Sequence, residues 1–548
     1  MLQIRIIRIV LCLVLMVIGY PLLVGAQSTP KLVVGITIDQ MRWDFLLRYK
    51  HRFHTLGGFN KVIQEGFSCH STFINYVPSY TACGHASIYT GTVPAVHGIT
   101  GNSWWDNGLQ EYVYCTEDDS VKTVGSGTDL GQMSPVNLLS TTISDQLKIA
   151  TNFKNKTIGI ALKDRGGILA AGHTADAAYW YDNEEGKWIT STYYMKELPS
   201  WVTHFNTREK VDSLYKLDWH LLYKEETYML SALPGGGAGA QAFGTPSRKF
   251  PINLRRYAGE NYGILPAIPQ GNTLTTEFAK AAILGEHLGA DTITDMLALS
   301  YSTTDYVGHA YGPNSKEVED TYLRLDIELG QFFDFLDRQV GKGSWVLFIT
   351  SDHGVAPVPS LAKAFKMPAG NLDDKRLNDG LNEYLKQQFG VDLFSKGINN
   401  AQVILNIDLI KKVKKVGVSD IAEAAIAWLE KQEGINRAVR FEDIERASLP
   451  DHTAGQLRNG YFPMRSGHIQ LIYKSGYIEG SMSGGTTHGT GYSYDTHIPL
   501  LWYGWNIPHG KLYRKTTIAD IAPTLAALLG IQEPSGTTGE VIYELFEK

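Results

Sequence analysis

The chain has 548 residues, of which 43% are hydrophobic and 19% are charged, with 11 Trp, 29 Tyr and 20 Phe. This composition provides material for a large apolar core and excludes an intrinsically disordered protein. The net charge is −6, from 50 Lys and Arg against 56 Asp and Glu, so the chain has no general basic surface and we expect no nucleic-acid partner.

The first 27 residues are predicted to be a secretory signal peptide. Two arginines precede an apolar run from Ile9 to Ile18, and small residues follow at 24–26. The run is shorter than the ~20 residues of a membrane span, although an uncleaved N-terminal anchor is the alternative. No later apolar segment approaches that length, so we expect residues 28–548 to have no membrane anchor. The signal peptide predicts export, and we expect the exported protein to be a monomer.

The cysteines give little information about the protein. Cys12 lies in the signal segment, which leaves Cys69, Cys83 and Cys115 in the mature chain. Three cysteines form at most one disulfide. Because no Cys-x-x-Cys spacing is present, the cysteines do not indicate a metal site.

Four apolar, β-branched runs are predicted to be strands, and each is followed at once by polar residues. The runs are residues 31–38, 157–162, 296–301 and 345–349. Near-continuous apolar runs of this length are typical of a parallel sheet that is covered by helices on both faces. Ligands of such sheets bind beyond the carboxyl ends of the strands. We therefore expect the polar residues that follow the four runs to gather at one edge.

Two long stretches between these strands differ from them in composition. Residues from about 170 to 285 are rich in Trp, Tyr and Gly, and residues from about 358 to 480 mix a charged helical pattern with loops. We interpret both as insertions that cap the ligand-binding edge of one domain, which spans residues 28–548. A strand at 497–503 and a helix at 517–529 then return the chain to the sheet. The predicted fold class is α/β, with a mostly parallel central sheet between helices.

Six Asp and His residues suggest a metal centre at this edge, namely Asp39, Asp305, His309, Asp352, His353 and His488. Oxygen and nitrogen ligands of this kind suit Zn²⁺, with Mn²⁺ or Fe as alternatives, and they disfavour Ca²⁺. Taken singly, each residue has a plainer interpretation as a helix cap, turn residue or core histidine. Taken together, they provide three ligands for each of two ions, and the open positions that remain are typical of catalytic sites.

The spacing of these residues is compatible with shared ions. One turn of helix would aim Asp305 and His309 at the same ion. The adjacent Asp352 and His353 can share an ion only if the strand ends there, and Gly354 permits this. His488 lies in a glycine-rich loop, residues 484–491, where the backbone can approach a ligand closely.

A loop that enters a helix near Thr81 and leaves it near Gly91 provides a candidate nucleophile. A hydroxyl bound to a metal has a lowered pKa, and a helix N-terminus favours an anion such as phosphate. The alternative is that Thr81 only caps the helix.

Lys163 and Arg165 are candidates to bind a phosphoryl group. They lie two residues apart at a predicted strand end, so they would share a face and bind the phosphoryl oxygens. Two solvated surface charges are the alternative. Asn102 is a candidate hydrogen-bond donor to the same group.

These motifs together resemble the nucleotide pyrophosphatase/phosphodiesterase branch of the alkaline phosphatase superfamily, and most of all its PafA-type periplasmic alkaline phosphatases. The similar parts are residues 81–91, the pair Asp305 and His309, residues 352–354, and His488 with Gly489, in the chain order of that family. The resemblance implies one zinc ion bound by Asp305, His309 and His488. It implies a second zinc bound by Asp39, Asp352 and His353 together with the nucleophile Thr81, and phosphoryl contacts from Asn102, Lys163 and Arg165.

The resemblance implies hydrolysis of small-molecule phosphate monoesters through a phosphothreonine intermediate, by a periplasmic enzyme with two Zn²⁺ per chain. A phosphodiesterase or nucleotide pyrophosphatase with the same metals is the alternative enzyme, and it would need an apolar surface where Lys163 and Arg165 stand. A sulfatase is disfavoured because residues 83–87 lack the Pro and Arg of a Cys-x-Pro-x-Arg motif. The alternative from a different class is a secreted binding protein that is stabilised by the metals and binds a glycan with its aromatic-rich insertions.

Overall fold

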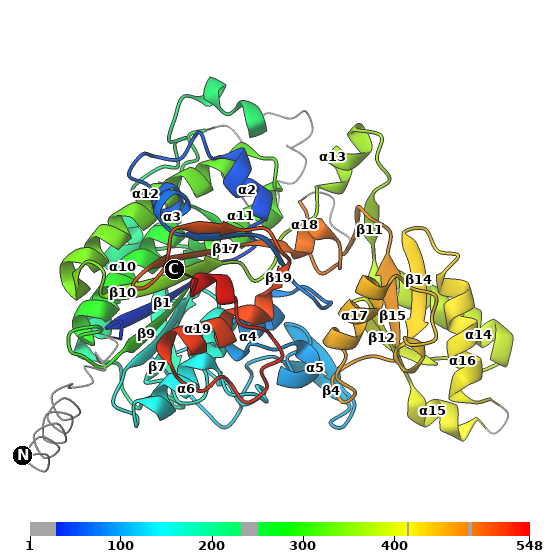
Figure 1. The fold of residues 1–548 in the computed structure, drawn as a ribbon. Helices are drawn as coiled ribbons and strands as arrows, with labels where there is room; N and C mark the ends of the chain where they lie inside the picture. Colours follow the sequence, from blue (N-terminus) through cyan, green and yellow to red (C-terminus); the bar gives the residue numbers. More distant parts are fainter. Residues whose placement is uncertain (1–28, 232–249, 414–415, 481–484, 548) are drawn as a thin grey trace, which may run out of the picture.

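The computed structural model describes residues 29–231, 250–413, 416–480 and 485–547 (Figure 1). The predicted signal peptide lies outside these ranges. An 11-stranded sheet forms the centre of the protein, in the order β18-β2-β17-β10-β1-β9-β6-β7-β8-β5, with β19 beside β2. The four strands predicted from apolar runs are adjacent and parallel in it. They are β1 (Leu32–Ile38), β6 (Thr157–Ala161), β9 (Asp295–Tyr301) and β10 (Trp345–Thr350). The predicted α/β fold class is confirmed.

Further strands extend the sheet on both sides of this parallel centre. On one side, β17 (His497–Gly504) pairs antiparallel with β10 and with β2 (Phe67–Phe73). The short strands β18 (Gly510–Leu512) and β19 (Thr516–Thr517) complete this edge.

The opposite edge corrects one predicted boundary. β7 (Ala177–Asp182) is parallel to β6, and β8 (Lys187–Ser191) and β5 (Thr123–Val124) follow antiparallel. β7 and β8 lie in the range from 170 to 285 that was predicted to cap the ligand-binding edge, so this prediction is wrong for residues 177–191. The reason is that the aromatic residues of β7 are buried core residues of the main sheet.

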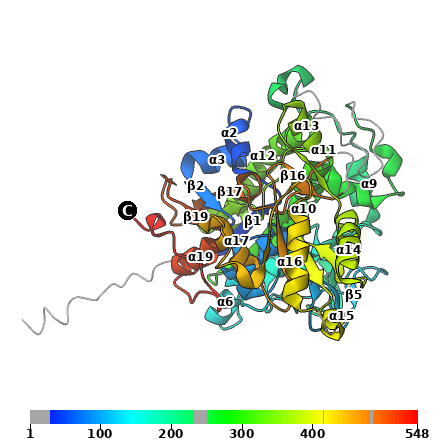
Figure 2. The same cartoon turned by 90° about the vertical axis from the view of Figure 1, so that its right-hand side faces the viewer.

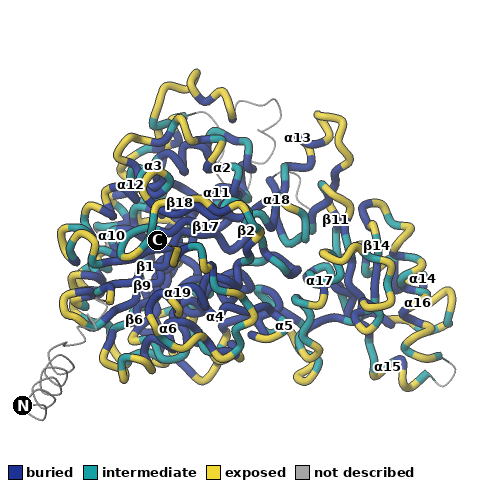
Figure 3. Tube along the Cα trace, viewed as in Figure 1, coloured by how far each residue is buried: buried dark blue, intermediate teal, exposed yellow. Residues whose placement is uncertain are grey.

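Helices cover both faces of the sheet, and β1 alternates between the two layers. Leu32, Val34 and Ile36 belong to a core shared with α2 (Trp43–Arg48), α3 (Gly58–Glu65), α10 (Gln270–Gly285) and α12 (Lys316–Leu336). Val33 faces the other way, into a core shared with α4 (Thr81–Thr90), α6 (Ile143–Ala150) and α19 (Ile521–Leu529). Figure 3 shows the strands as a buried layer inside the helices.

Residues 359–480 form a separate lobe beside the main sheet (Figures 1 and 2). Its antiparallel sheet has the order β12-β13-β15-β14, and it packs on two helices around a core of its own. Arg465 ties the lobe to the main body, because Nη1 donates to the backbone oxygens of Gly98 (2.8 Å) and Asn137 (2.7 Å). The elements of the lobe are α13 (Pro359–Ala364), β11 (Gly370–Leu372), α14 (Asp374–Phe389), β12 (Ser395–Asn399), β13 (Gln402–Leu405), α15 (Ile407–Lys412), α16 (Val418–Leu429), β14 (Ile435–Arg440), α17 (Asp451–Gly460), β15 (Ile469–Tyr473) and β16 (Tyr477–Glu479).

The remaining helices and strands are short. They are α5 (Pro94–His97), β3 (Ser103–Asp106), β4 (Glu111–Tyr114), α7 (Asp164–Ala171), α8 (Ser200–Phe205), α9 (Arg208–Tyr215), α11 (Thr303–Tyr311) and α18 (Ser493–Thr496). Among the described residues, no helix has both the length and the hydropathy needed to cross a membrane. Cys69, Cys83 and Cys115 are buried and free, so these three form no disulfide.

Helix α4 lies so close to the end of β10 that residue 84 has no room for a side chain. A Cβ at Gly84 would lie 2.3 Å from the backbone oxygen of Asp352. We expect Gly84→Ala to lower the free energy of unfolding by about 1–3 kcal/mol, which is the usual cost of overpacking a filled interior. Urea unfolding followed by circular dichroism measures this change.

Gly455→Ala in α17 is the matched control for this substitution. The nearest atom to a Cβ there is Nη2 of Arg458, at 3.9 Å. Because alanine is the better helix former by about 1 kcal/mol, this variant should be as stable as the wild type or slightly more stable. If both variants changed stability equally, the close approach of α4 to β10 would be contradicted.

Candidate active site

The predicted site residues gather at the carboxyl ends of the four parallel strands. Asp39 directly follows β1, Asp352 follows β10, and Asp305 lies in α11 after β9. Lys163 follows β6. Because the strands lie in the order β10-β1-β9-β6, these four side chains come from neighbouring strands at one edge of the sheet.

Three carboxylates are buried here with a single ammonium group. Nζ of Lys163 lies 2.7 Å from Oδ2 of Asp39 and 2.5 Å from Oδ2 of Asp305. Burial alone would lower the pKa of Lys163, but Asp305 and Asp39 outweigh it and raise this pKa, so the side chain is charged. Among the described residues, Oδ1 of Asp39 and Oδ2 of Asp352 are buried without a hydrogen-bond partner. Buried carboxylates need cationic partners, so this donor set fits metal cations.

Three histidines direct Nε2 toward these carboxylates. Nδ1 of each lies against a backbone oxygen: His309 against Thr486 (2.8 Å), His353 against Gly354 (2.9 Å) and His488 against Ser79 (2.7 Å). A carbonyl oxygen only accepts, so Nδ1 of each histidine carries a proton. Burial would lower the pKa of His309, but Asp305, with Oδ1 3.0 Å from Nε2, outweighs it and raises this pKa. Burial lowers the pKa of His353 and of His488, which keeps both imidazoles neutral, as metal ligands are.

The donor atoms form two groups in which all atoms lie within 4.8 Å of one another. The first group is Asp305, His309 and His488, which is the set that the resemblance implied for one ion. The second is Asp39, Asp305 and His353. The resemblance implied Asp352 instead of Asp305 in this second set, and Oδ2 of Asp352 lies 3.3 Å from Nε2 of His353. Asp305 therefore belongs to both groups of donor atoms.

The chain turns sharply after β10, and this turn brings Asp352 and His353 to the same site. Gly354 packs tightly against the segment before β17, since a Cβ there would lie 2.2 Å from the backbone oxygen of Tyr494. The amide of Gly354 donates to the backbone oxygen of Asp495 (2.7 Å). β10 already ends at Thr350, so the adjacent Asp352 and His353 are not held on opposite faces of a regular strand.

Thr81 is the first residue of α4, and its hydroxyl faces the carboxylate cluster. The N-cap residue is Tyr80, and no side chain caps this helix, so the cap interpretation of Thr81 does not hold. Oγ1 of Thr81 lies 3.2 Å from Nε2 of His353 and 3.5 Å from Nζ of Lys163. Because Nδ1 of His353 carries the proton, the Thr81 hydroxyl donates to Nε2.

Lys163 and Arg165 do not share a strand face, which corrects the predicted reason for their pairing. Lys163 is the N-cap of α7, and Arg165 lies in the first turn of that helix. Nη1 of Arg165 donates to the hydroxyl of Tyr114 (3.0 Å), which donates to Oδ1 of Asp164 (2.9 Å). Nε of Arg165 is buried and has no hydrogen-bond partner among the described residues. The guanidinium that Tyr114 orients therefore keeps one N–H group free to donate.

Asn102 lies beside the start of α4. Its Oδ1 accepts a hydrogen bond from the backbone amide of Ala82 (3.0 Å). This bond fixes the orientation of the side-chain amide, and it leaves the NH₂ group available to donate elsewhere.

The sequence did not reveal two further polar residues of the site. His85 lies one helical turn after Thr81, with Nδ1 2.9 Å from the backbone oxygen of Thr81 and 3.4 Å from Oδ2 of Asp352. Gln40 has a φ of 66°, and its Nε2 donates to Oδ1 of Asp305 (2.5 Å). The spacing of His85 from Thr81 was a usable signal, whereas only adjacency to Asp39 singles out Gln40.

Comparisons with known proteins identify the family of the chain. The chain matches the family described as type I phosphodiesterase / nucleotide pyrophosphatase over residues 33–493. It is 47% identical over 520 residues to alkaline phosphatase PhoV of Synechococcus elongatus, covering 95% of this chain and 94% of the relative. It is also 47% identical over 523 residues to a Myroides odoratus protein named calcium-transporting ATPase, covering 95% of each. The crystal structure of alkaline phosphatase PafA matches with a TM-score of 0.91 and 42% identity, covering 94% of this chain and 99% of the other.

The predicted resemblance is confirmed along nearly the whole length of these relatives. The matched residues 33–493 contain the candidate nucleophile, every candidate metal ligand, the strands β6, β9 and β10, and all of β1 except its first residue. The chain therefore belongs to the type I phosphodiesterase / nucleotide pyrophosphatase family, in which it is similar to the PafA-type alkaline phosphatases.

Proposed function

We propose that the protein is an alkaline phosphatase that hydrolyses phosphate monoesters through transfer of the phosphoryl group to Thr81. The observation that carries this proposal is the buried ammonium of Lys163, 3.5 Å from the Thr81 hydroxyl. A monoester carries one more charged oxygen than a diester, so a fixed positive charge beside the nucleophile favours the monoester. Two of the relatives are named alkaline phosphatases, which supports the same function.

We infer that the site holds two Zn²⁺ ions. One is assigned to Asp305, His309 and His488, and the other to Asp39, Asp352 and His353 together with Thr81. Neutral imidazoles combined with carboxylates support zinc rather than Ca²⁺ or Mg²⁺. When bound, such ions lower the pKa of a coordinated hydroxyl and neutralise charge on the transferring group.

The chain's own residues then account for binding and transfer. Oγ1 of Thr81 attacks phosphorus, the bond to the ester oxygen breaks, and the alcohol leaves with the proton that the Thr81 hydroxyl loses. Water attacks the phosphothreonine in a second step, which releases inorganic phosphate and restores the Thr81 hydroxyl. Lys163, Arg165 and the amide of Asn102 hold the phosphoryl oxygens, and the Tyr114 contact orients Arg165 (3.0 Å).

The alternative is a phosphodiesterase with the same metals, because the family description includes that activity. A diester has a second ester group in place of one charged oxygen. The buried Lys163 and the oriented Arg165 favour a charged oxygen at that place. We further propose that residues 1–27 are removed on export and that the mature enzyme acts as a monomer in the periplasm.

Replacement of the nucleophile tests the transfer step. Thr81→Ala should abolish hydrolysis of an aryl phosphate, whereas Thr81→Ser should retain part of kcat because it keeps a hydroxyl group. Acid quenching during turnover, followed by mass spectrometry of peptides, should find phosphate on residue 81 of the wild type. Unchanged turnover by Thr81→Ala would refute the assignment.

Removal of the Arg165 guanidinium tests the preference for monoesters. We expect Arg165→Ala to lower kcat/KM for an aryl phosphate by about 10- to 100-fold. This loss corresponds to the free energy that a hydrogen bond to a charged group usually contributes. The matching methyl aryl diester should lose much less. Arg514→Ala is the control, because this arginine pairs with Glu544 (2.5 Å) away from the site. Equal losses on both substrates would reject the role of Arg165.

Metal analysis tests the ligand assignment without an activity assay. We expect two zinc ions per wild-type chain by inductively coupled plasma mass spectrometry. His309→Ala and Asp305→Ala should each lose about one ion, because both residues belong to the set that is assigned to one zinc. His173→Ala is the control, since this partly exposed histidine pairs with Asp145 (3.2 Å) instead. Full zinc content in Asp305→Ala would contradict the assignment.

A further inference from the structure

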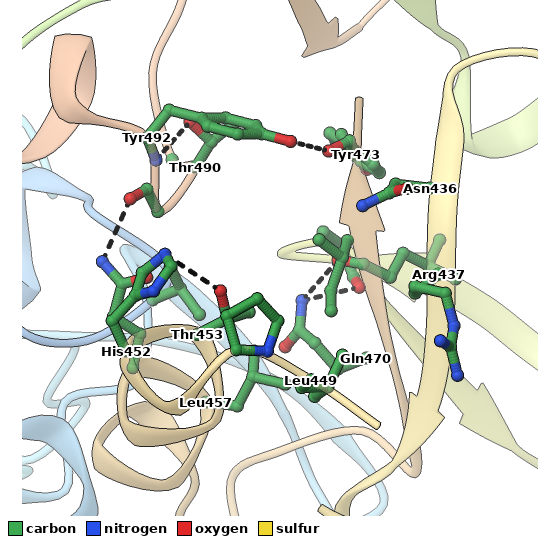
Figure 4. A pocket seen from close by; sticks show the side chains of 18 of the residues that line it. Asn436, Arg437, Leu449, His452, Thr453, Leu457, Gln470, Tyr473, Thr490 and Tyr492 are labelled. Carbon is green, nitrogen blue, oxygen red and sulfur yellow. Dashed lines mark hydrogen bonds between the residues drawn. The ribbon is translucent and has the colours of Figure 1, made fainter. Parts of the chain in front are cut away.

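A pocket of about 450 Å³ lies between the lobe and the candidate active site. Figure 4 shows walls from β14, β15 and α17 of the lobe and from the loop 488–492, and Tyr80 also lines the pocket. The volume is within the range of about 300–1,000 Å³ that is usual for sites of small organic ligands. None of the residues proposed to hold the phosphoryl group lines it, so the pocket is a place for something other than phosphate.

The pocket adjoins the site on the side of the first donor group. His488 lines the pocket, and its Nε2 lies 3.7 Å from Oδ1 of Asp305. Thr81 contacts His353, which belongs to the second donor group. In an in-line displacement the departing oxygen lies opposite the attacking one. With Thr81 attacking from the side of His353, the departing oxygen would lie on the side of Asp305, His309 and His488, and the last of these residues lines the pocket.

Tyr80 strengthens this connection because it links the pocket to the nucleophile along the chain. It lines the pocket and directly precedes Thr81. Its ring lies edge-on to the ring of His488, with 5.5 Å between the centroids. Its hydroxyl donates to Oε2 of Glu479 in the lobe (2.5 Å), so the lobe fixes the position of this wall.

The chemistry of the walls favours an uncharged, partly apolar occupant. Aliphatic side chains alternate with aromatic rings, including Leu449, Leu457, Tyr473 and Tyr492. The arginine in the walls already pairs with Glu430 (Arg437 Nε to Oε1, 2.9 Å), and Oε2 of Glu479 accepts a hydrogen bond from Tyr80 (2.5 Å). A negatively charged leaving group would therefore gain no free counter-charge from the arginine.

Neutral amides provide specific hydrogen-bonding groups in the same walls. Nε2 of Gln470 donates to the backbone oxygens of Ala401 (3.1 Å) and Leu471 (3.0 Å), so its side-chain oxygen is the atom left to accept. Asn436 lies on the strand beside it, across the pocket from Thr453 of α17 (Figure 4). A flat ring with polar edges satisfies such a lining better than an aliphatic chain does.

We propose that this pocket, the leaving-group pocket, binds the alcohol part of the substrate and selects monoesters of uncharged alcohols that carry a flat ring, such as an aryl alcohol or a nucleoside. The proposal rests on the proposed phosphomonoesterase function, and it adds the substrate class. Methyl phosphate reaches the phosphoryl site but is too small to fill the pocket, so it reports on the chemistry alone.

The test fills the pocket from two opposite walls. Asn436→Trp and Thr453→Trp should each lower kcat/KM for adenosine 5′-monophosphate and phenyl phosphate at least 10-fold, while kcat/KM for methyl phosphate changes less than twofold. Each loss is taken relative to the wild type on the same substrate, so differences in intrinsic reactivity cancel. Gln388→Trp is the control, because residue 388 is an exposed amide on α14 outside the pocket, and it should alter none of the three.

A binding measurement separates this proposal from the function on which it rests. Saturation-transfer NMR with free adenosine and free phenol should show binding to the wild type and to Gln388→Trp, and loss of binding in both pocket variants. Equal losses on all three substrates, or no loss on the two ring-bearing esters, would overturn the proposal. If the wild type hydrolysed no monoester but bound both alcohols in the pocket, the proposed function would fail while the ligand class of the pocket would stand.

Discussion

The central constraint in this protein is the burial of three carboxylates beside one ammonium group at the end of a parallel sheet. Burial raises the pKa of Asp39, and the nearby Asp305 and Asp352 raise it further. Lys163 offsets only part of this charge. Burying such a cluster costs free energy of desolvation unless cations bind to it. The repulsion among the buried carboxylates destabilises the empty cluster, and the same negative charge attracts metal ions.

The histidines show how the surrounding backbone prepares the cluster for those ions. The three carbonyl oxygens that hold Nδ1 belong to the segment before α4, the turn after β10 and the loop before His488. Each bond fixes a tautomer and directs Nε2 inward. Three segments that are far apart in the sequence therefore each orient one histidine of the site. They can approach one another because Gly354 and Gly84 have no side chain where the backbone packs closely.

The sequence was sufficient to predict the centre of the fold and most of the candidate site. The four parallel strands have continuous apolar runs because both of their faces are buried, and polar residues that follow such strands share one edge of the sheet. The prediction failed where local pattern and tertiary burial diverged. Residues 177–191 are aromatic-rich because they complete the sheet edge, and Arg165 is fixed by Tyr114, which lies in another segment. No local pattern reveals the leaving-group pocket, since Tyr80 and the lobe meet only in the folded chain.

The lobe at 359–480 has its own sheet and its own core, yet its described residues contribute no metal donor and no candidate nucleophile. Under the two proposals made above, reactivity and recognition are carried by separate packing units that touch along Tyr80 and the loop 488–492. A lineage can replace residues of the lobe without disturbing the charge balance of the cluster. This arrangement allows substrate choice to diversify among relatives while the phosphoryl-transfer chemistry stays the same.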